Sequence, residues 1–309
     1  MFALQYSQFG PPGVLGVGEA EAPHAGPGEV RIAVRASGVT PSDGKLRAGA
    51  LGDRALKWPH IPGMDAAGVV DEVGAGVTGT ALGDAVFGLV DIARLGGAAA
   101  EFAVLTAWAA KPDAFSWEQA GAAASGIETS TRVLDALRVT AGTTLLIDGA
   151  AGGVGSAAVQ LAAARGATVI GTASPANHAF LAGLGATPTV YGPGLAERVA
   201  ALAPGGVDAV LDAAGAGSLP DLVAIAGDAD RVVTIADMHA HDHGVRLSHT
   251  APGSTATPGY AGLPLAASLA AQGRFTVPLY AVFALADAAR AHELSATGHA
   301  RGKIVLTVP

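Results

Sequence analysis

The first third of the chain contains short runs in which apolar and polar residues alternate. Residues 30–36 (Val-Arg-Ile-Ala-Val-Arg-Ala) show this most clearly, and residues 66–73, 85–89 and 100–105 follow between glycine-rich turns. A period of two is typical of strands with one buried face. Several short strands at this spacing predict a compact, β barrel-like domain.

From about Ser116 the pattern changes to helices that alternate with strands. Ser116 is a suitable N-cap for a helix over 116–124, and strands are predicted at 168–172, 207–211 and 231–235. Alternation of this kind predicts an α/β fold, a doubly wound parallel sheet with helices on both faces. At the end of the chain, a helix over 283–294 precedes a strand over 303–308. That strand has no partner signal nearby, so it could pair back with the N-terminal domain.

A glycine-rich turn joins a buried strand over 143–147 to an alanine-rich helical segment. The turn reads Gly149-Ala-Ala-Gly-Gly-Val-Gly155, and a second strand signal follows at 167–172. This strand–turn–helix–strand unit is typical of dinucleotide-binding domains, in which the helix N-terminus receives a pyrophosphate. Ala150 stands at the first glycine position of the usual motif, and a glycine loop without nucleotide is the alternative. The predicted ligands of the diphosphate are Gly149, Ala151, Gly152, Gly153, Val154 and Gly155.

The end of the second strand indicates which coenzyme the site prefers. NAD sites usually place an Asp or Glu there for the ribose hydroxyls. This chain has Thr172, Ser174, Asn177 and His178 instead, with no carboxylate to repel a 2′-phosphate and no Lys or Arg to attract one. Hydroxyl, amide and imidazole groups can donate hydrogen bonds to a phosphate. We therefore expect NADP(H) as the cofactor, in preference to NAD(H).

Composition and charge narrow the class of protein. The 309 residues exceed the usual size of a single core, which predicts two domains. Half of the residues are hydrophobic and 14% are charged, as in a compact cytoplasmic enzyme, and neither a membrane-length apolar run nor a basic secretion signal occurs. The absence of cysteine excludes disulfides, thiolate nucleophiles and cysteine-bound zinc. The net charge of −8 disfavours nucleic acid and anionic membranes as partners.

Four segments, in order and spacing, carry a resemblance to a known family. They are residues 38–43, residues 61–70 with 83–88, residues 149–155 and residues 298–305. On these the chain resembles the zinc-independent quinone oxidoreductase branch of the medium-chain dehydrogenase/reductase superfamily, over essentially its whole length. The resemblance implies a GroES-like catalytic domain, 1–116 and 270–309, and a Rossmann domain, 117–269. It also implies a homodimer formed through sheet edges of the Rossmann domains, with the final strand paired to the N-terminal domain.

The resemblance also implies that no metal is used. The zinc-dependent alcohol dehydrogenases hold their catalytic zinc with a Cys where this chain has Thr40 and with a His where it has Met64. Zinc requires about three firm protein ligands. A run of three histidines, His239-Ala-His-Asp-His243, would share one face on an extended segment. It lies in a predicted loop without a further ligand nearby, so we expect no metal there either.

Three residues are candidates for catalysis. Thr40 lies where the resemblance puts the wall facing the nicotinamide, and its hydroxyl could donate to an oxyanion or to the cofactor ribose, although a simple turn residue is the alternative. Asp65 could hold a proton if it is desolvated, or be a carboxylate satisfied by backbone amides. Asp43 is expected to cap a short helix. Glu128 lies in a segment that passes near the nicotinamide in the resembled enzymes. It could bind the nicotinamide ribose or act as an acid, or be a first-turn Glu favoured by the helix dipole.

Further cofactor contacts are implied by the resemblance alone. Tyr191 matches an aromatic residue beside the adenosine 2′-phosphate, with simple packing as the alternative. Ile235 and Ala236 end the strand that lines the nicotinamide. Arg301 and Lys303 match a basic pair near the cofactor phosphates, although they could also be solvated.

Taken together, these features predict a zinc-independent, NADPH-dependent oxidoreductase. Without a metal, an electron-poor alkene or quinone is an easier hydride acceptor than a simple ketone, because hydrogen-bond donors suffice to stabilise the enolate or hydroquinone anion. The expected substrate is therefore a small molecule, a quinone or an α,β-unsaturated carbonyl. An enoyl or enone reductase of a biosynthetic pathway and a non-catalytic NADPH-binding sensor are the alternatives.

Overall fold

The computed structural model describes residues 1–50, 56–250, 254 and 256–309. Its contacts divide the chain into two compact units. The first unit joins Met1–Ser125 to Leu263–Pro309, and the second is Gly126–Gly262. The sequence placed the boundaries at 116/117 and 269/270. The structure assigns helix α3 (Trp117–Gly121) to the first unit, where it packs against five strands of that unit's sheet.

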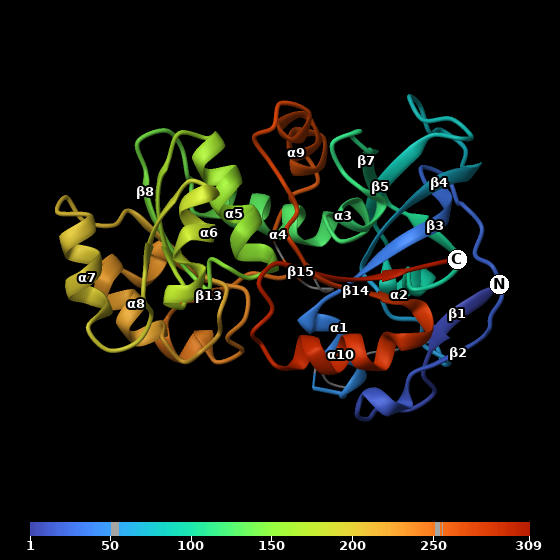
Figure 1. The fold of residues 1–309 in the computed structure, drawn as a ribbon, viewed down its shortest axis with the longest axis horizontal. Coiled ribbons are helices and arrows are strands. Elements are labelled where there is room, and N and C mark those ends of the chain that lie inside the picture. Colours follow the sequence, from blue (N-terminus) through green and yellow to red (C-terminus); the bar gives the residue numbers. More distant parts are fainter. Residues whose placement is uncertain (51–55, 251–253, 255) are drawn as a thin grey trace. The chain divides into compact units, whose positions relative to one another are not determined.

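The first unit is built on a seven-stranded sheet in the order β14-β15-β3-β4-β5-β7, with β6 also paired to β3 (Figure 1). Its strands are antiparallel except for the pair β14–β15. Their bounds are β3 (Val30–Val39), β4 (Asp65–Val73), β5 (Ala85–Leu89), β6 (Phe102–Leu105), β7 (Ala107–Ala110), β14 (Leu279–Ala284) and β15 (Lys303–Thr307). The alternating segments of the first third are therefore strands, as predicted.

Both termini contribute to the first unit. Strand β15 pairs antiparallel with β3, from Ile304 opposite Val39 to Thr307 opposite Ala36, which confirms the predicted return of the final strand. The remaining elements are β1 (Phe2–Gln5), β2 (Gly16–Glu19), α1 (Pro41–Arg47), α2 (Ile92–Leu95), α9 (Gly262–Ala271) and α10 (Ala288–Ala296), with 3-10 turns η1 (Pro12–Val14) and η5 (Leu285–Asp287).

The predicted helix over 283–294 is wrong at its start. Phe283 and Ala284 belong to β14, where they lie opposite Leu306 and Thr307 of β15. Their backbone groups bond to the sheet, and the α-helix begins only at Ala288 after a 3-10 turn. Exposure alternates along β14, but all six of its residues are hydrophobic, so no period-two pattern of apolar and polar residues marks this strand in the sequence.

The second unit is a six-stranded, all-parallel sheet in the order β10-β9-β8-β11-β12-β13. The strands are β8 (Thr144–Asp148), β9 (Thr168–Thr172), β10 (Ala186–Thr189), β11 (Ala209–Asp212), β12 (Val232–Thr234) and β13 (Arg246–Leu247). Helices α5 (Gly153–Ala164), α6 (His178–Gly183), α7 (Leu195–Leu202) and α8 (Leu219–Ala226) pack around it (Figure 1). Leu145, Leu146 and Ile147 of the inner strand β8 are fully buried, as expected for a sheet covered on both faces.

Two adjoining helices carry the chain into the second unit. Ser116 caps α3 in a capping box with Gln119, as its position predicted. The helix ends at Gly121, however, three residues earlier than expected. A Cβ at Gly121 would lie 2.5 Å from the carbonyl oxygen of Ala36, so the helix and β3 approach closely there. Helix α4 (Ala124–Ala136) then continues past the boundary between the units.

Candidate nucleotide-binding site

The turn between β8 and α5 has the geometry that a dinucleotide diphosphate requires. Gly149 has a φ of +79°, a conformation that side chains rarely adopt. A Cβ at Gly155 would lie 2.3 Å from the carbonyl oxygen of Gly149, so the helix packs directly on the turn. Gly152 is the N-cap of α5, and a Cβ there would meet only that same oxygen, at 3.5 Å. A phosphate can therefore approach the backbone at this helix N-terminus closely.

The predicted diphosphate ligands differ in how accessible they are. Gly155 is buried inside the turn, whereas the half-buried members are Gly149, Ala151, Gly152, Gly153 and Val154. Helix α4 supports the turn from behind, since Ser130 Oγ donates to the carbonyl oxygen of Val154 at 3.1 Å. The amides of Gly149 and Gly152 already donate, to Thr172 Oγ1 and to the carbonyl oxygen of Gly149. The amides of Ala151, Gly153 and Val154 are therefore the ones left to reach a ligand.

A buried carboxylate that the sequence reading did not single out holds the turn in place. Asp148 ends β8, and its carboxylate accepts hydrogen bonds from Thr172 Oγ1 at 2.5 Å and from Ser218 Oγ at 2.7 Å. Thr172 Oγ1 in turn accepts a bond from Gly149 N at 3.0 Å. Thr172 was expected to bind the cofactor, but its fully buried hydroxyl is used by the turn itself. An Asp directly after a buried apolar strand was the signal for this role.

A second buried aspartate shapes the neighbouring strand end. Asp212 ends β11 opposite Asp148 and accepts bonds from Ala214 N and Gly215 N at 2.9 Å and from Thr234 Oγ1 at 2.7 Å. Burial raises the pKa of Asp212, an effect that these hydrogen bonds oppose and the negative charge of Asp148 reinforces.

Hydrogen bonds to Asp212 and Thr234 also position Ile235 and Ala236, the residues expected to line the nicotinamide. Ile235 N donates to the carbonyl oxygen of Asp212 at 3.0 Å, and Ala236 N donates to Thr234 Oγ1 at 3.1 Å. Both predicted residues therefore lie immediately after β12, at the carboxyl edge of the parallel sheet. This edge is where ligands bind in open α/β sheets.

The residues expected near the adenosine follow two adjacent strands of the same edge. Ser174 and Asn177 come after β9, with Asn177 Nδ2 donating to Ser174 Oγ at 3.3 Å, and His178 begins α6. Tyr191 follows β10, which pairs with β9, and its ring is 58% exposed. Its exposure argues against the simple packing alternative.

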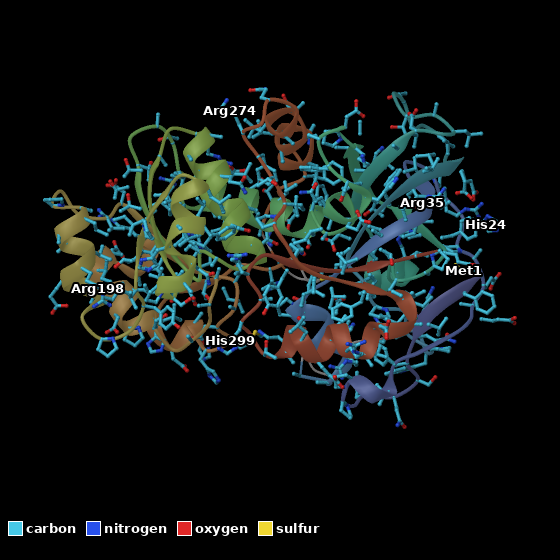
Figure 2. All side chains as sticks on the ribbon, in the orientation of Figure 1. Met1, His24, Arg35, Arg198, Arg274 and His299 are labelled. Carbon is cyan, nitrogen blue, oxygen red and sulfur yellow. The ribbon has the colours of Figure 1, made fainter. Side chains whose placement is uncertain are left out.

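Arg198 is a cation in this region that the sequence reading missed. It projects from α7 (Figure 2), and its guanidinium donates to the carbonyl oxygens of Pro193 and Val190 at 2.9 Å and of Gly192 at 3.2 Å. It thereby holds the loop that carries Tyr191. It lies in a helix, seven residues beyond Tyr191, and therefore outside the loop after β9 in which a cation for a 2′-phosphate is expected.

In the first unit, the two positions that bind zinc in the resembled alcohol dehydrogenases lie together. Thr40 Oγ1 approaches Met64 Sδ at 3.7 Å. Thr40 is the N-cap of α1 in a capping box with Asp43, and its hydroxyl donates to Asp43 Oδ2 at 2.7 Å. Asp43 is thus the partner of the cap and not the cap itself. A hydroxyl and a thioether are not a zinc ligand set.

Asp65 is fully buried in a second cluster of the first unit. Its Oδ2 accepts bonds from Ser125 N at 3.0 Å and Ser125 Oγ at 2.6 Å, and Lys303 Nζ lies 3.7 Å away. Lys303 Nζ also donates to Ser125 Oγ at 3.0 Å. The ammonium group expected at the cofactor phosphates is therefore buried against Asp65 and Ser125. Arg301 is exposed.

Glu128, the third catalytic candidate, is a member of a saturated ion pair. Its carboxylate accepts bonds from Arg132 at 2.8 and 3.2 Å, from Gly259 N at 3.1 Å and from Thr129 Oγ1 at 3.2 Å. Arg132 also donates to Ser248. Both charged side chains are about 95% buried. These contacts fit a structural role that joins α4 to the end of the second unit.

The histidine run does not form a shared face. Residues 240–243 adopt a 3-10 turn, so the side chains of His239, His241 and His243 no longer repeat with the period of an extended chain. His239 and His241 each contact Asp242, at 3.6 and 2.9 Å, and both are about 80% exposed. Within residues 1–50, 56–250 and 256–309 no group of three potential metal-binding side chains occurs.

These two units define a nucleotide-binding dehydrogenase fold, a GroES-like unit and a Rossmann unit. The family model of the alcohol dehydrogenase GroES-like domain matches residues 26–112, and that of the zinc-binding dehydrogenases matches residues 184–306. A solved structure of an alcohol dehydrogenase superfamily protein from Novosphingobium aromaticivorans is 30% identical, with a TM-score of 0.87 and full coverage of both chains. The chain belongs to the medium-chain dehydrogenase/reductase superfamily, in its quinone oxidoreductase branch.

Curated relatives cover about half of the chain. Pig (Sus scrofa) quinone oxidoreductase is 38% identical over 180 residues, which are 56% of this chain and 53% of that protein. A polyketide synthase from Streptomyces halstedii is 42% identical over 161 residues, 51% of this chain and 3% of the synthase. The chain therefore spans about half the length of the first and a small part of the second.

Other solved structures match over the whole chain. The quinone oxidoreductase from Coxiella burnetii is 29% identical, with a TM-score of 0.83 and coverage of 100% of this chain and 99% of that one. A mycobacterial protein complexed with NADPH is 27% identical with a TM-score of 0.82, and an NAD-dependent alcohol dehydrogenase is 29% identical with a TM-score of 0.86, both at full coverage. In the part of the chain that the structure describes, no helix has the length and apolar character to cross a membrane.

Proposed function

We propose that this chain is a zinc-independent, NADPH-dependent reductase that transfers hydride to a quinone or an α,β-unsaturated carbonyl. The observation that carries the proposal is the turn between β8 and α5. There Gly149 adopts a positive φ, Gly155 packs on the turn, and Gly152 leaves the helix N-terminus open. The amides of Ala151, Gly153 and Val154 would bind the diphosphate, and the bound coenzyme would supply the hydride.

The side chains of the first unit favour conjugated acceptors. Thr40 and Met64 replace the Cys and His of the zinc-dependent relatives, so a carbonyl oxygen must be stabilised by hydrogen-bond donors. Thr40 is the candidate donor, and its hydroxyl would have to leave Asp43 Oδ2 to serve a substrate. The contacts of Asp65 and Glu128 suit positioning roles. Asp65 accepts a hydrogen bond that orients Ser125, and Glu128 pairs with Arg132.

We propose NADPH as the preferred coenzyme because no carboxylate follows β9 and a structural relative is complexed with NADPH. Ser174→Asp would place a carboxylate where a 2′-phosphate is expected. We expect this variant to reverse the preference, with the ratio of Kd for NADH to Kd for NADPH falling about tenfold or more. Titration of both coenzymes by fluorescence measures this. Ser268→Asp, on an exposed position of α9, is the control, and an equal change there would contradict the assignment.

The match to a polyketide synthase favours one alternative, an enoyl reductase of a biosynthetic pathway. A steady-state assay of NADPH oxidation with a panel of quinones, enones and enoyl thioesters separates the readings. Turnover of quinones and free enones supports the proposal, whereas turnover confined to thioesters supports the alternative. Binding of NADPH without oxidation across the panel would instead identify a sensor.

We also propose a homodimer formed through the second unit. Strand β13 ends the parallel sheet and pairs with β12 on one side only among the described residues. An unpaired edge offers backbone donors and acceptors to a second copy. Light scattering of the purified protein gives the mass in solution, and a monomer would contradict this proposal.

A further inference from the structure

The first unit contains a cluster of buried polar side chains that the proposed function does not use. The described residues contain seven buried side-chain nitrogen or oxygen atoms without a hydrogen-bond partner, and four of them belong to this cluster. They are Tyr6 OH, Arg47 Nε, His60 Nε2 and His292 Nδ1. All four side chains are at least 96% buried. With Asp43 they are called the Tyr6 cluster below.

These residues come from four separate parts of the chain, which the fold joins in pairs. Tyr6 and His60 form an antiparallel bridge, with backbone bonds of 3.0 and 2.8 Å and ring centroids 5.3 Å apart. Arg47 ends α1, and its Nη1 donates to the carbonyl oxygen of Gly10 at 2.5 Å. His292 lies on α10, which packs against α1 (Figure 1). Unpartnered atoms therefore come from the N-terminal strand region, α1, the segment before β4, and α10.

The charges within the Tyr6 cluster are already balanced. The carboxylate of Asp43 accepts bonds from Thr40 N, Thr40 Oγ1 and Gly63 N, at 2.7–3.0 Å. Its charge opposes that of Arg47, and both act on the pKa values of Tyr6 and His292. Burial lowers the pKa of His60 and of His292, so both imidazoles are neutral at neutral pH.

We propose that the Tyr6 cluster is a binding site for internal water. Buried polar groups in folded proteins are almost always hydrogen-bonded, and those without protein partners are satisfied by ordered water. Water is both donor and acceptor, as this set demands. Arg47 Nε can only donate, a neutral imidazole offers one donor and one acceptor, and the Tyr6 hydroxyl can do either. The water links α10 to α1 and to the bridge between Tyr6 and His60.

An anion is the other ligand that an arginine and a tyrosine could bind. It would add an uncompensated negative charge next to Asp43 in a buried site, which is costly. A neutral ligand leaves the balance between Asp43 and Arg47 intact. The choice of water over an anion therefore follows from the charges, and the experiments below separate the two.

Whether the Tyr6 hydroxyl has a hydrogen-bond partner can be tested by whether Tm falls or rises when the hydroxyl is removed. Tyr6→Phe removes the hydroxyl and little else. If water satisfies that hydroxyl, the variant loses a hydrogen bond, and we expect Tm to fall by about 2–4 °C. If the hydroxyl is truly unpaired, its removal relieves a cost and Tm stays or rises. Tyr280→Phe is the control, because Tyr280 lies in the same unit and is 46% exposed. Its Tm should not change.

A direct count of bound water provides the second test. Oxygen-17 relaxation dispersion of the full chain reports long-lived internal water, and His292→Phe should lose at least one such molecule. His299→Phe, at an exposed histidine (Figure 2), should lose none. A crystal structure should show solvent density bonded to at least two of the four atoms. Direct pairing of the four atoms with protein groups, or an anomalous bromide peak at the cluster after soaking, would overturn the proposal.

Discussion

Two buried polar clusters, one in each unit, differ in whether the protein satisfies them. In the second unit, the Glu128 carboxylate accepts four hydrogen bonds: two from Arg132, one from Gly259 N and one from Thr129 Oγ1. Arg132 also donates to Ser248. In the first unit, the Tyr6 cluster has four atoms without a protein partner. Burial is nearly the same in both. Burial alone therefore does not separate a candidate functional group from a structural one. The more useful sign is a buried polar atom that has no hydrogen-bond partner within the protein.

The largest effect is expected where the saturated pair is broken. Glu128→Ala leaves Arg132 buried without its counter-charge, which should lower the free energy of unfolding by about 3–5 kcal/mol. Asp135→Ala is the matched control on the same helix, α4. Asp135 also pairs with an arginine, Arg165 at 2.7 Å, but its side chain is 61% exposed. Its loss should cost at most about 1 kcal/mol. Denaturant unfolding measures both, and equal costs would remove the distinction drawn here.

Two glycines of the turn between β8 and α5 differ in the space around them. Gly155→Ala places a Cβ 2.3 Å from the carbonyl oxygen of Gly149, and we expect a stability loss of roughly 1–3 kcal/mol. Gly152→Ala meets nothing closer than 3.5 Å, so its stability should be nearly unchanged while the Kd for NADPH rises about tenfold. Thermal unfolding and coenzyme titration on both variants check this. Unaltered NADPH binding by Gly152→Ala would contradict the assigned diphosphate site.

A smaller effect on stability is expected from the two buried histidines of the Tyr6 cluster when the pH is lowered. Burial lowers the pKa of His60 and His292 below the ordinary 6.5, although Asp43 opposes the shift in both. Below pH 6.5 the unfolded chain therefore binds protons that the folded chain does not. The free energy of unfolding is therefore highest above pH 6.5. It decreases as the pH falls below 6.5, by at most about 1.4 kcal/mol per pH unit for each histidine.

Tm measured between pH 7 and pH 5 reports this loss. His292→Phe should flatten the dependence, because one of the two titrating groups is gone, whereas His299→Phe should leave it unchanged. The charge of Asp43 acts on both histidines and that of Arg47 acts on His292, while the ring of Tyr6 lies 5.3 Å from that of His60. A dependence that is identical in both variants would show that His292 is not a source of the acid sensitivity.

Local patterns in the sequence were sufficient for much of the fold. The strand at 85–89 was predicted with the bounds of β5, Ser116 was recognised as a cap, and the glycine turn was placed between β8 and α5. Each of these depends on residues close together in the chain. The strand β14 was missed because its pairing partner, β15, lies more than twenty residues later and decides that Phe283 and Ala284 extend the sheet.

The candidate site was less predictable. Glu128 was considered as a catalytic acid because its partners could not be seen, and one of them, Gly259, is 131 residues away. Lys303 was expected at the cofactor phosphates, yet its ammonium contacts Ser125, 178 residues earlier in the chain. Thr172 was expected to contact the cofactor, but its hydroxyl bonds to Asp148.

The sequence by itself determined the class of fold, the position of the nucleotide turn and the lack of a zinc ligand set. These follow from hydrophobic periodicity, from glycines that permit unusual backbone conformations, and from residue types at single positions. Only the tertiary structure decided which polar groups are saturated and which still need a partner. Hydrogen bonds are short and directional, so their formation depends on contacts between segments distant in sequence, which no local pattern specifies.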